Sequence, residues 1–378
     1  MTEVDTKELR EAKRSGRLIT FAFVAIPLVL IVIVLFLTYA VSGQRHKSLS
    51  AGKTFYSLEN MENYVLARDA AGRPLALVGE GAALPRGYPD IQAVRVPVKR
   101  VAVATGEFDA GIMESLGMAD SVIALSLKQE EVYSPRLSER YKEGKITYLG
   151  QPYPMNYELV KSLEPDLVLC PSLRDAEILE EMGLPTSVSY SPLDNSLEAR
   201  MFFVDYIAAF AGKDREARAF QDRVEEALAA LDARSAGLPK TKVMWAVVFE
   251  KRVFVEPGEN WVGEMIPRLG ADYLFSHVKG DSTIEVSLEH FVEVGRDADV
   301  LVLYPDPYQL NGSKEDIIRQ NSNLAPLRPL GPDGRAFATL PIFYESFGRL
   351  DEIADELFAI FHPTMYPNRE FVFFRELH

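Results

Sequence analysis

The same order of predicted elements occurs twice after residue 97, and this duplication restricts the chain to a fold with two similar halves. In the first half, apolar strands at residues 100–105 and 166–170 flank a helix that closes with Leu-Gly. In the second half, residues 242–248 and 299–303 repeat that pattern, again with a Leu-Gly helix end. Apolar strands that alternate with helices form parallel sheets covered on both faces. We therefore predict an α/β fold of two small open parallel-sheet lobes.

Two helical segments separate the halves. The apolar face of the first consists of residues spaced for one buried stripe: Phe202, Phe203, Tyr206, Ile207 and Phe210. The second is longer, begins near Asp214 and is stopped by the Gly-Leu-Pro sequence at residues 237–239. One long helix that joins two lobes limits hinge bending, so we expect lobe motions to be small.

An uncharged apolar run occupies residues 18–41. As a helix, its 24 residues would extend about 36 Å, against a membrane hydrocarbon core of about 30 Å. A cleaved signal peptide has a shorter apolar region of roughly 7 to 15 residues, although Ala40 and Ser42 resemble a cleavage site. No cysteine follows the run for lipid attachment. The basic residues are denser before the run than after it, which predicts a cytoplasmic N-terminus and a single-pass protein of the inner (cytoplasmic) membrane, with its binding domain periplasmic or extracellular.

Chain length and the positions of turn-forming residues suggest how the rest of the chain is divided into domains. A chain of 378 residues is long enough for two folding units. The residues around Gly72-Arg73-Pro74 have the turn chemistry of a hairpin. The predicted parts are a tail at 1–17, an anchor at 18–41, an extension with the hairpin at 46–97, an N-lobe at 98–193, interlobe helices at 194–237 and a C-lobe at 238–378.

Charge and metal-ligating residues exclude several classes of partner. The net charge of −14 argues against nucleic acid, which requires a basic face. The single cysteine, Cys170, permits neither an internal disulfide nor a multi-cysteine metal cage. The five histidines lack the spacing of a metal site, so we predict no resident cofactor.

Several ordered motifs resemble the binding proteins of iron-siderophore, haem and cobalamin ABC importers. Asn156-Tyr-Glu158, followed by Leu163-Glu-Pro-Asp166 and a Leu-Val-Leu strand, is similar to the family's first-lobe pattern. Val286-Ser-Leu-Glu289 is similar to the second-lobe counterpart, and Phe361-His-Pro363 to the C-terminal helix end. The resemblance covers about residues 98–363. It implies a substrate-binding protein, not an enzyme, that presents an iron complex or a corrinoid to an ABC permease and its ATPase subunit.

The resemblance also implies roles for two glutamates. In the family, one surface glutamate on each lobe engages arginines of the permease, and the motifs place those positions at Glu158 and Glu289. Each glutamate taken alone also fits the first turn of a helix, where a carboxylate stabilises the macrodipole.

Ligands of open α/β sheets bind beyond the carboxyl ends of the strands, which allows the cleft loops to be chosen from sequence. Aromatic side chains are frequent in these loops and suit a large chelate or macrocycle. Tyr153 or Tyr344 can ligate ferric haem through phenolate, with Met155 as a softer second ligand. Tyr308 is a further aromatic candidate. The predicted ligand-binding residues are Glu107, Phe108, Tyr153, Met155, Ser172, Glu250, Trp261, Tyr304, Tyr344 and Glu345.

Two other functions remain open at this point. The chain has no phosphate-binding loop, no Gly-x-Ser-x-Gly elbow and no His-Glu-x-x-His helix. An anchored hydrolase or chelatase-like enzyme would have to use a carboxylate pair such as Glu107 and Glu345. A membrane-tethered ligand sensor of the same fold is the other alternative. Finally, residues 370–374 read as a strand that we expect to pair with residues 55–66.

Overall fold

The computed structural model describes residues 56–83, 91–189, 195–280, 282–304 and 312–378. The chain forms two compact units, residues 1–53 and 54–378, and all the described residues belong to the second. The predicted tail (1–17), the predicted anchor (18–41) and Tyr308 lie outside the described residues. Within the described part, no helix is long and apolar enough to cross a membrane.

The N-lobe is built on a sheet of five parallel strands in the order β7-β6-β5-β8-β9. The central strands are fully apolar and buried, as expected for a sheet covered on both faces. The strands are β5 (Val101–Val103), β6 (Val122–Leu125), β7 (Thr147–Tyr148), β8 (Leu167–Cys170) and β9 (Thr186–Val188). The helices are α2 (Glu107–Ser115), α3 (Pro135–Lys142), α4 (Tyr157–Ser162) and α5 (Leu173–Glu181).

The C-lobe sheet is mixed, which corrects the expectation of a second purely parallel sheet. Four of its strands are parallel: β10 (Lys242–Phe249), β12 (Asp272–Tyr273), β14 (Val300–Tyr304) and β15 (Arg335–Thr339). Three pair antiparallel: β11 (Arg252–Val255), β13 (Ile284–Val286) and β16 (Phe374–Leu377). A two-residue connection at Glu250 and Lys251 joins β10 to β11, and so short a link connects only antiparallel strands. The helices are α8 (Trp261–Arg268), α9 (Leu288–Gly295), α10 (Lys314–Gln320) and α11 (Leu350–Phe361).

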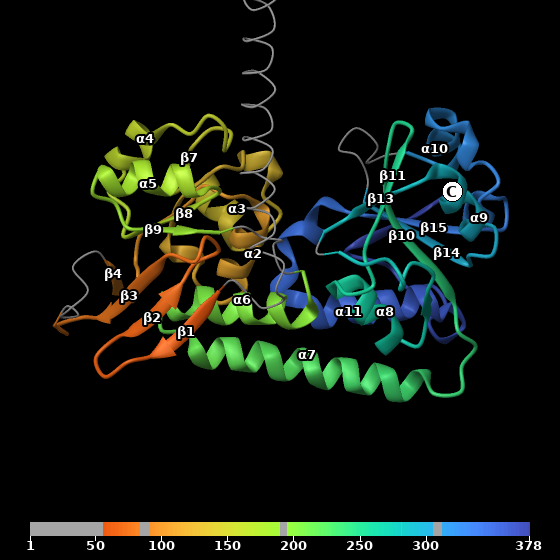
Figure 1. The fold of residues 1–378 in the computed structure, drawn as a ribbon, viewed down its shortest axis with the longest axis horizontal. Coiled ribbons are helices and arrows are strands. Elements are labelled where there is room, and N and C mark those ends of the chain that lie inside the picture. Colours follow the sequence, from red (N-terminus) through yellow and green to blue (C-terminus); the bar gives the residue numbers. More distant parts are fainter. Residues whose placement is uncertain (1–55, 84–90, 190–194, 281, 305–311) are drawn as a thin grey trace, which may run out of the picture. The chain divides into compact units, whose positions relative to one another are not determined.

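The predicted connector is present as two helices, α6 (Leu197–Ala209) and α7 (Asp214–Ser235). The buried side of α7 has helical spacing and consists of Ala217, Phe220, Val224, Leu228 and Leu231. This helix packs against α6, α8 and α11, and Figure 1 shows it running along one side of both lobes. The connector thus contacts the C-lobe through α7 and the N-lobe helix α2 through α6.

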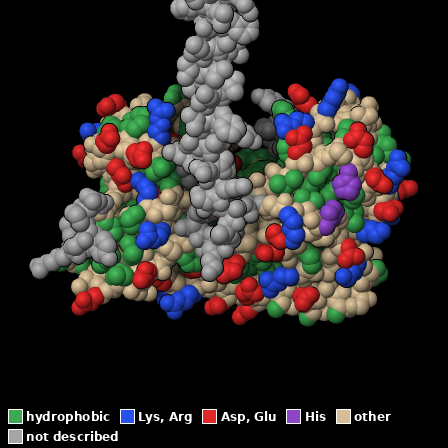
Figure 2. Space-filling view, in the orientation of Figure 1, with side chains coloured by type: hydrophobic (Ala, Val, Ile, Leu, Met, Phe, Trp, Pro, Cys, Tyr) green, Lys and Arg blue, Asp and Glu red, His purple; other side chains and the backbone are tan. Residues whose placement is uncertain are grey.

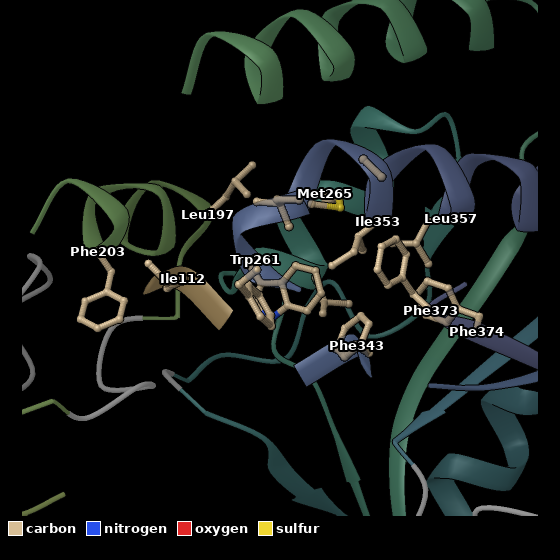
Figure 3. Packing of buried hydrophobic residues seen from close by; sticks show 14 of the residues in the cluster. Ile112, Leu197, Phe203, Trp261, Met265, Phe343, Ile353, Leu357, Phe373 and Phe374 are labelled. Atoms are coloured by element: carbon tan, nitrogen blue, oxygen red, sulfur yellow. The ribbon is translucent and has the colours of Figure 1, made fainter. Parts of the chain in front are cut away.

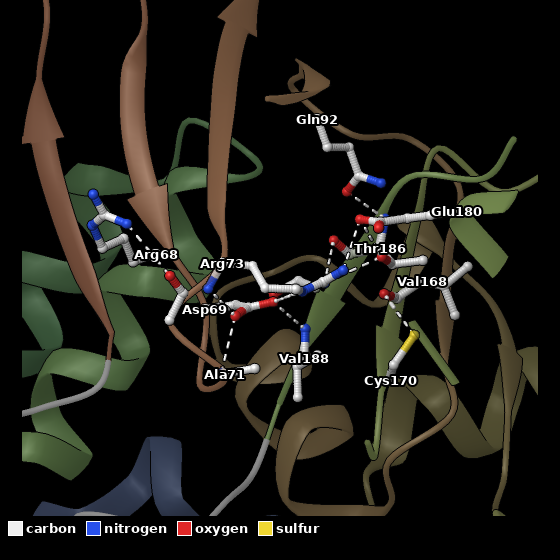
Figure 4. Close-up of polar contacts among 12 residues, drawn as sticks. Arg68, Asp69, Ala71, Arg73, Gln92, Val168, Cys170, Glu180, Thr186 and Val188 are labelled. Carbon is white, nitrogen blue, oxygen red and sulfur yellow. Dashed lines mark hydrogen bonds and ion pairs between the residues drawn. The ribbon is translucent and has the colours of Figure 1, made fainter. Parts of the chain in front are cut away.

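A small sheet outside the lobes contains β1 (Ser57–Asn60), β2 (Val65–Arg68), β3 (Pro74–Gly79) and β4 (Gln92–Val96). The strands β2 and β3 form the hairpin expected around Gly72. Asp69, at the turn, accepts hydrogen bonds from its neighbours and from the N–H of Val188 in β9. Arg73 pairs with both Asp69 and Glu180 of α5 (Figure 4). A buried polar network thus fixes this sheet to the N-lobe.

The C-terminal strand is Phe374–Leu377, not 370–374 as predicted, and it lies in the C-lobe, contrary to the predicted pairing with residues 55–66. The strand β16 pairs with β15, whereas β1 pairs with β2. Phe374 packs against Trp245 and Phe343 in the C-lobe core (Figure 3). Each buried phenylalanine side chain contributes roughly 1.5 to 3 kcal/mol, so the core position of Phe373 and Phe374 explains where the strand goes.

Candidate functional site

A cleft of about 480 Å³ is lined by residues of both lobes and of the connector. From the N-lobe come the loop after β5 and the start of α2, together with Pro171 and Ser189. The C-lobe contributes mainly aromatic side chains. The lining residues are Thr105, Gly106, Glu107, Phe108, Asp109, Pro171, Ser189, Arg200, Glu256, Tyr304, Phe343, Tyr344 and Phe347.

The first turn of α2 forms the polar wall of the cleft. Gly106 precedes the helix with φ of 152°, a backbone conformation that L side chains rarely adopt. Thr105 Oγ1 donates a hydrogen bond of 2.6 Å to Asp109 Oδ2. Burial raises the pKa of Asp109 to about 6, although its hydrogen bonds act in the opposite direction. The wall therefore carries a carboxylate that takes up a proton more readily than an ordinary aspartate.

Aromatic side chains from the carboxyl end of β14 and from the segment after β15 form the opposite wall. The rings of Tyr304 and Tyr344 lie 6.2 Å apart between centroids, and Phe343 lies 6.1 Å from Tyr304. Burial raises the pKa of Tyr304 and of Tyr344 above the ordinary phenol value. Both phenols are therefore neutral near pH 7, and either would need a bound metal to become a phenolate.

A single cation, Arg200 in the first turn of α6, lies among the described lining residues. Its guanidinium carbon lies 4.2 Å from the ring centroid of Phe347 and 5.2 Å from those of Phe108 and Trp261. Its Nη2 donates a hydrogen bond of 2.6 Å to Asn195 Oδ1. Burial lowers the pKa of Arg200 to about 10, so the group remains protonated at neutral pH.

Glu256 is the buried acid of the C-lobe side, with 4% of its surface exposed. The side chain of Asn260 donates a hydrogen bond to it, and Asn260 Oδ1 accepts from the N–H groups of Val262 and Gly263 in the first turn of α8. Burial raises the pKa of Glu256, while Arg200 and hydrogen bonds from Tyr304 and Asn260 act in the opposite direction. This acid is held in place by partners within the protein.

Four of the predicted ligand-binding residues line the cleft: Glu107, Phe108, Tyr304 and Tyr344. Two more lie beside it. Tyr153 is 64% exposed, and its hydroxyl lies 3.4 Å from the carbonyl oxygen of the lining residue Pro171. Ser172 follows Pro171 and caps α5 by accepting from the N–H of Asp175.

The other four predicted residues lie elsewhere in the fold. Met155 is buried in the N-lobe core, and Trp261 is buried behind the aromatic wall against Trp245 and Phe347. Glu250 lies in the tight turn after β10, where its carbonyl oxygen accepts from Asn321. The carboxylate of Glu345 accepts from the backbone N–H groups of residues 133 and 134 in the other lobe.

The sequence reasoning missed Asp109, Arg200 and Glu256. Asp109 had a detectable signal, because it lies within one turn of the loop already chosen from the end of β5. The other two had none: Arg200 precedes an apolar stripe that reads as core, and Glu256 lies in an irregular loop. No group of three or more potential metal-ligating side chains occurs among the residues that the structure describes. On the face seen in Figure 2, basic side chains are interspersed with acidic ones and form no patch.

Comparison with known proteins agrees with this geometry. The model of the periplasmic binding protein family matches residues 102–322, more than half of the chain. This chain belongs to the periplasmic binding protein family. Membership confirms the resemblance inferred from sequence and makes the chain an extracytoplasmic binding protein. The small sheet formed by β1–β4 precedes the matched region.

Relatives and solved structures extend the comparison. Two uncharacterised lipoproteins of Methanocaldococcus jannaschii are 24% and 25% identical, covering 75% of this chain and 70% and 74% of their own lengths. A periplasmic haem-binding protein from Pseudomonas aeruginosa has a TM-score of 0.58 at 17% identity, covering 74% of this chain and 98% of that chain. CeuE of Helicobacter pylori, in a Ni-His complex, has a TM-score of 0.58 at 16% identity, covering 82% and 90%. These solved structures share the fold with this chain.

Proposed function

We propose that the protein is the membrane-anchored substrate-binding component of an ABC importer, and that its cargo is an iron complex (siderophore or haem) or a corrinoid. The observation that carries the proposal is the cleft of about 480 Å³, to which both lobes contribute aromatic faces. Ligand pockets for small molecules typically have volumes of roughly 300 to 1,000 Å³ and mostly apolar walls with a few fixed polar groups. Family membership supports the same class of activity.

The chemistry of the cleft favours a metal held in a chelate over a bare ion. The described residues offer no cluster of potential metal ligands, while flat rings such as Tyr304, Tyr344 and Phe108 suit the face of a macrocycle or chelate. Met155 lies in the N-lobe core, so a second haem ligand would have to come from another residue. Tyr344 remains the candidate for a phenolate ligand within the cleft.

Two exposed glutamates fit the proposed contact with a permease. Glu158 lies in the first turn of α4 and Glu289 in the first turn of α9, one on each lobe. Neither forms an ion pair with another described residue. Exposed pairs are worth only about 0 to 1 kcal/mol, so these glutamates would orient the complex more than strengthen it.

Binding by the purified full-length protein tests the proposal directly. Ferric siderophores, haem and cobalamin would be titrated while the fluorescence of Trp245 and Trp261 is followed. We expect saturable one-to-one binding of one class without chemical change of the ligand, weakened by Tyr344→Ala and unaffected by Tyr366→Ala. No binding across the panel would refute the proposal, and turnover of a ligand would favour the enzyme alternative.

Transport separates the importer from a sensor of the same fold. Glu158→Lys and Glu289→Lys should leave ligand affinity unchanged and reduce uptake by cells, because the charge reversal opposes docking on permease arginines. A matched reversal at Glu293, another exposed residue of α9, serves as the control. Unchanged uptake in the double variant would contradict the docking assignment.

A further inference from the structure

Arg200, which lines the cleft, is a half-buried cation with two buried donors that have no hydrogen-bond partner. Among the described residues, its Nη2 donates a hydrogen bond to Asn195 Oδ1. Its Nε and Nη1 are buried without a hydrogen-bond partner, and the described carboxylate that acts on it electrostatically, Glu256, does so without an ion pair. Burying a charge without full pairing is costly, and each unsatisfied donor adds about 1 to 3 kcal/mol. A ligand that supplied the missing acceptor would relieve this cost.

The aromatic rings around Arg200 only partly compensate for the missing acceptor. Phe347, Phe108 and Trp261 lie within cation–π distance of the guanidinium. Such contacts are worth about 0.5 to 2 kcal/mol, but a ring face does not replace a hydrogen-bond acceptor for an in-plane N–H. Phe108 comes from the N-lobe and Phe347 from the C-lobe, so a small separation of the lobes would uncover the guanidinium.

Glu256 acts on Arg200 electrostatically, but no described acid of the cleft accepts a hydrogen bond from the buried Nε and Nη1 of this cation. Glu256 is engaged by Asn260, and Asp109 by Thr105. Burial raises the pKa of both carboxyls, so both accept protons more readily than ordinary acids. Glu107 lies in the first turn of α2, where the helix macrodipole offsets its charge. Arg200 therefore keeps two buried donors that no described acid of the cleft engages.

We infer that the ligand presents an anionic oxygen group, such as a carboxylate, to Arg200, and that the cleft thereby selects anionic chelates over neutral ones of the same size. This inference rests on the proposed function and names the chemical class of its ligand. A guanidinium suits this role because its planar donors match a carboxylate with two parallel hydrogen bonds. The aromatic walls would contact the body of the chelate while Arg200 binds its anionic group.

The test uses matched pairs of probes on the full-length protein. Haem is compared with its dimethyl ester, which keeps the iron and the macrocycle but masks both carboxylates. Ferric citrate is compared with a neutral ferric trihydroxamate. Within at least one pair, the anionic member should bind ten-fold or more tightly. Arg200→Gln should abolish that preference, Arg200→Lys should retain part of it, and Arg296→Gln, a change at an exposed arginine of the C-lobe, should leave it intact.

The outcomes separate the inference from the proposed function. Saturable binding of neutral and anionic members with equal affinity would overturn the inference and leave the proposed function standing. An unchanged preference in Arg200→Gln would also overturn it. Failure of all four probes to bind the wild-type protein would overturn both. If Arg200→Gln does not fold, the wild-type comparison of haem with its ester and the Arg200→Lys variant still decide the question.

Discussion

Glu345 Oε2 accepts a hydrogen bond of 2.6 Å from the backbone N–H of Ser134, so a C-lobe side chain binds the residue that precedes the N-lobe helix α3. Its Oε1 accepts from the N–H of Tyr133 at 2.8 Å. Glu114 caps the same helix, α3, from within the N-lobe, through the N–H groups of Arg136 and Leu137. One helix start is thus held by two carboxylates, and only one of them joins the lobes.

Glu345→Ala should weaken the link between the lobes. It leaves two N–H groups without their acceptor, and hydrogen bonds to charged groups are each worth about 1.5 to 3 kcal/mol. We expect the free energy of unfolding to fall by about 3 to 6 kcal/mol for the two hydrogen bonds together, and the radius of gyration from small-angle scattering to increase. Glu114→Ala, the matched control, should lower stability without changing the radius of gyration. Equal scattering curves for both variants would contradict the interlobe role.

Gly111→Ala should force the same interface apart. A Cβ at Gly111 of α2 would lie 1.8 Å from the carbonyl oxygen of Glu345, and the neighbouring atoms are backbone that cannot rotate away. Overpacking costs typically about 1 to 3 kcal/mol, and here it acts between the lobes. We expect a lower unfolding midpoint in urea together with an increased radius of gyration. Gly79→Ala is the control, because nothing lies within 4 Å of its added Cβ; equal midpoints for the two variants would show that the interface tolerates the methyl group.

The parts of the fold that depend on local sequence were predictable. The repeated strands, the Leu-Gly helix ends and the connector helices each follow from periodicity and capping chemistry over a few residues. The mixed C-lobe sheet was not predicted, because the tight turn at Glu250 interrupts the strand–helix alternation that the prediction assumed. The position of β16 was also missed, since the pairing of Phe337 with Glu376 is a contact between distant parts of the chain.

The candidate site was predictable only in part, for a related reason. Strand ends indicate which loops meet at the cleft, and this rule chose Glu107 and Tyr304, which line it. The same rule does not tell which side chain of a loop points into the cleft. It therefore led to the choice of Glu345, one residue after Tyr344, although the carboxylate of Glu345 points to the other lobe. Arg200 comes from the connector, to which the strand-end rule does not apply.

Asp109→Asn should stabilise the protein at neutral pH. The pKa of Asp109 is raised from 3.8 to about 6, so between these values the folded protein binds more protons than the unfolded chain. Stability contributed by this group therefore falls as pH rises from about 4 to 6, and it remains lost above pH 6. Asparagine keeps an acceptor for Thr105 without the charge. We expect a gain of roughly 1 to 3 kcal/mol at pH 7.5, since one pKa unit corresponds to about 1.4 kcal/mol.

Urea unfolding of the wild type and of Asp109→Asn at several pH values tests the expected sign of the stability change and its dependence on pH. The stability difference should be largest at pH 7.5, shrink through pH 6 to 4 and be absent below pH 4. Asp316→Asn is a control for which the stability change should have the opposite sign, because hydrogen bonding from Ser313 lowers the pKa of Asp316. A pH-independent difference for Asp109→Asn would show that the carboxyl titrates alike in the folded and unfolded chains.

Asp69→Ala should detach the small sheet from the N-lobe. Asp69 is fully buried, pairs with Arg73 and accepts from the N–H groups of Ala71, Arg73 and Val188 (Figure 4). Removal of one partner from a buried ion pair costs about 3 to 5 kcal/mol, because the remaining charge and donors stay buried. We expect proteolysis within residues 60–99 under conditions in which the wild-type sheet resists, while the lobes stay intact. Arg68→Ala, which removes an exposed side chain on the adjacent strand, should leave the digestion pattern unchanged. Resistance of Asp69→Ala equal to that of wild type would mean that the apolar contacts of β2 and β3 alone hold the sheet in place.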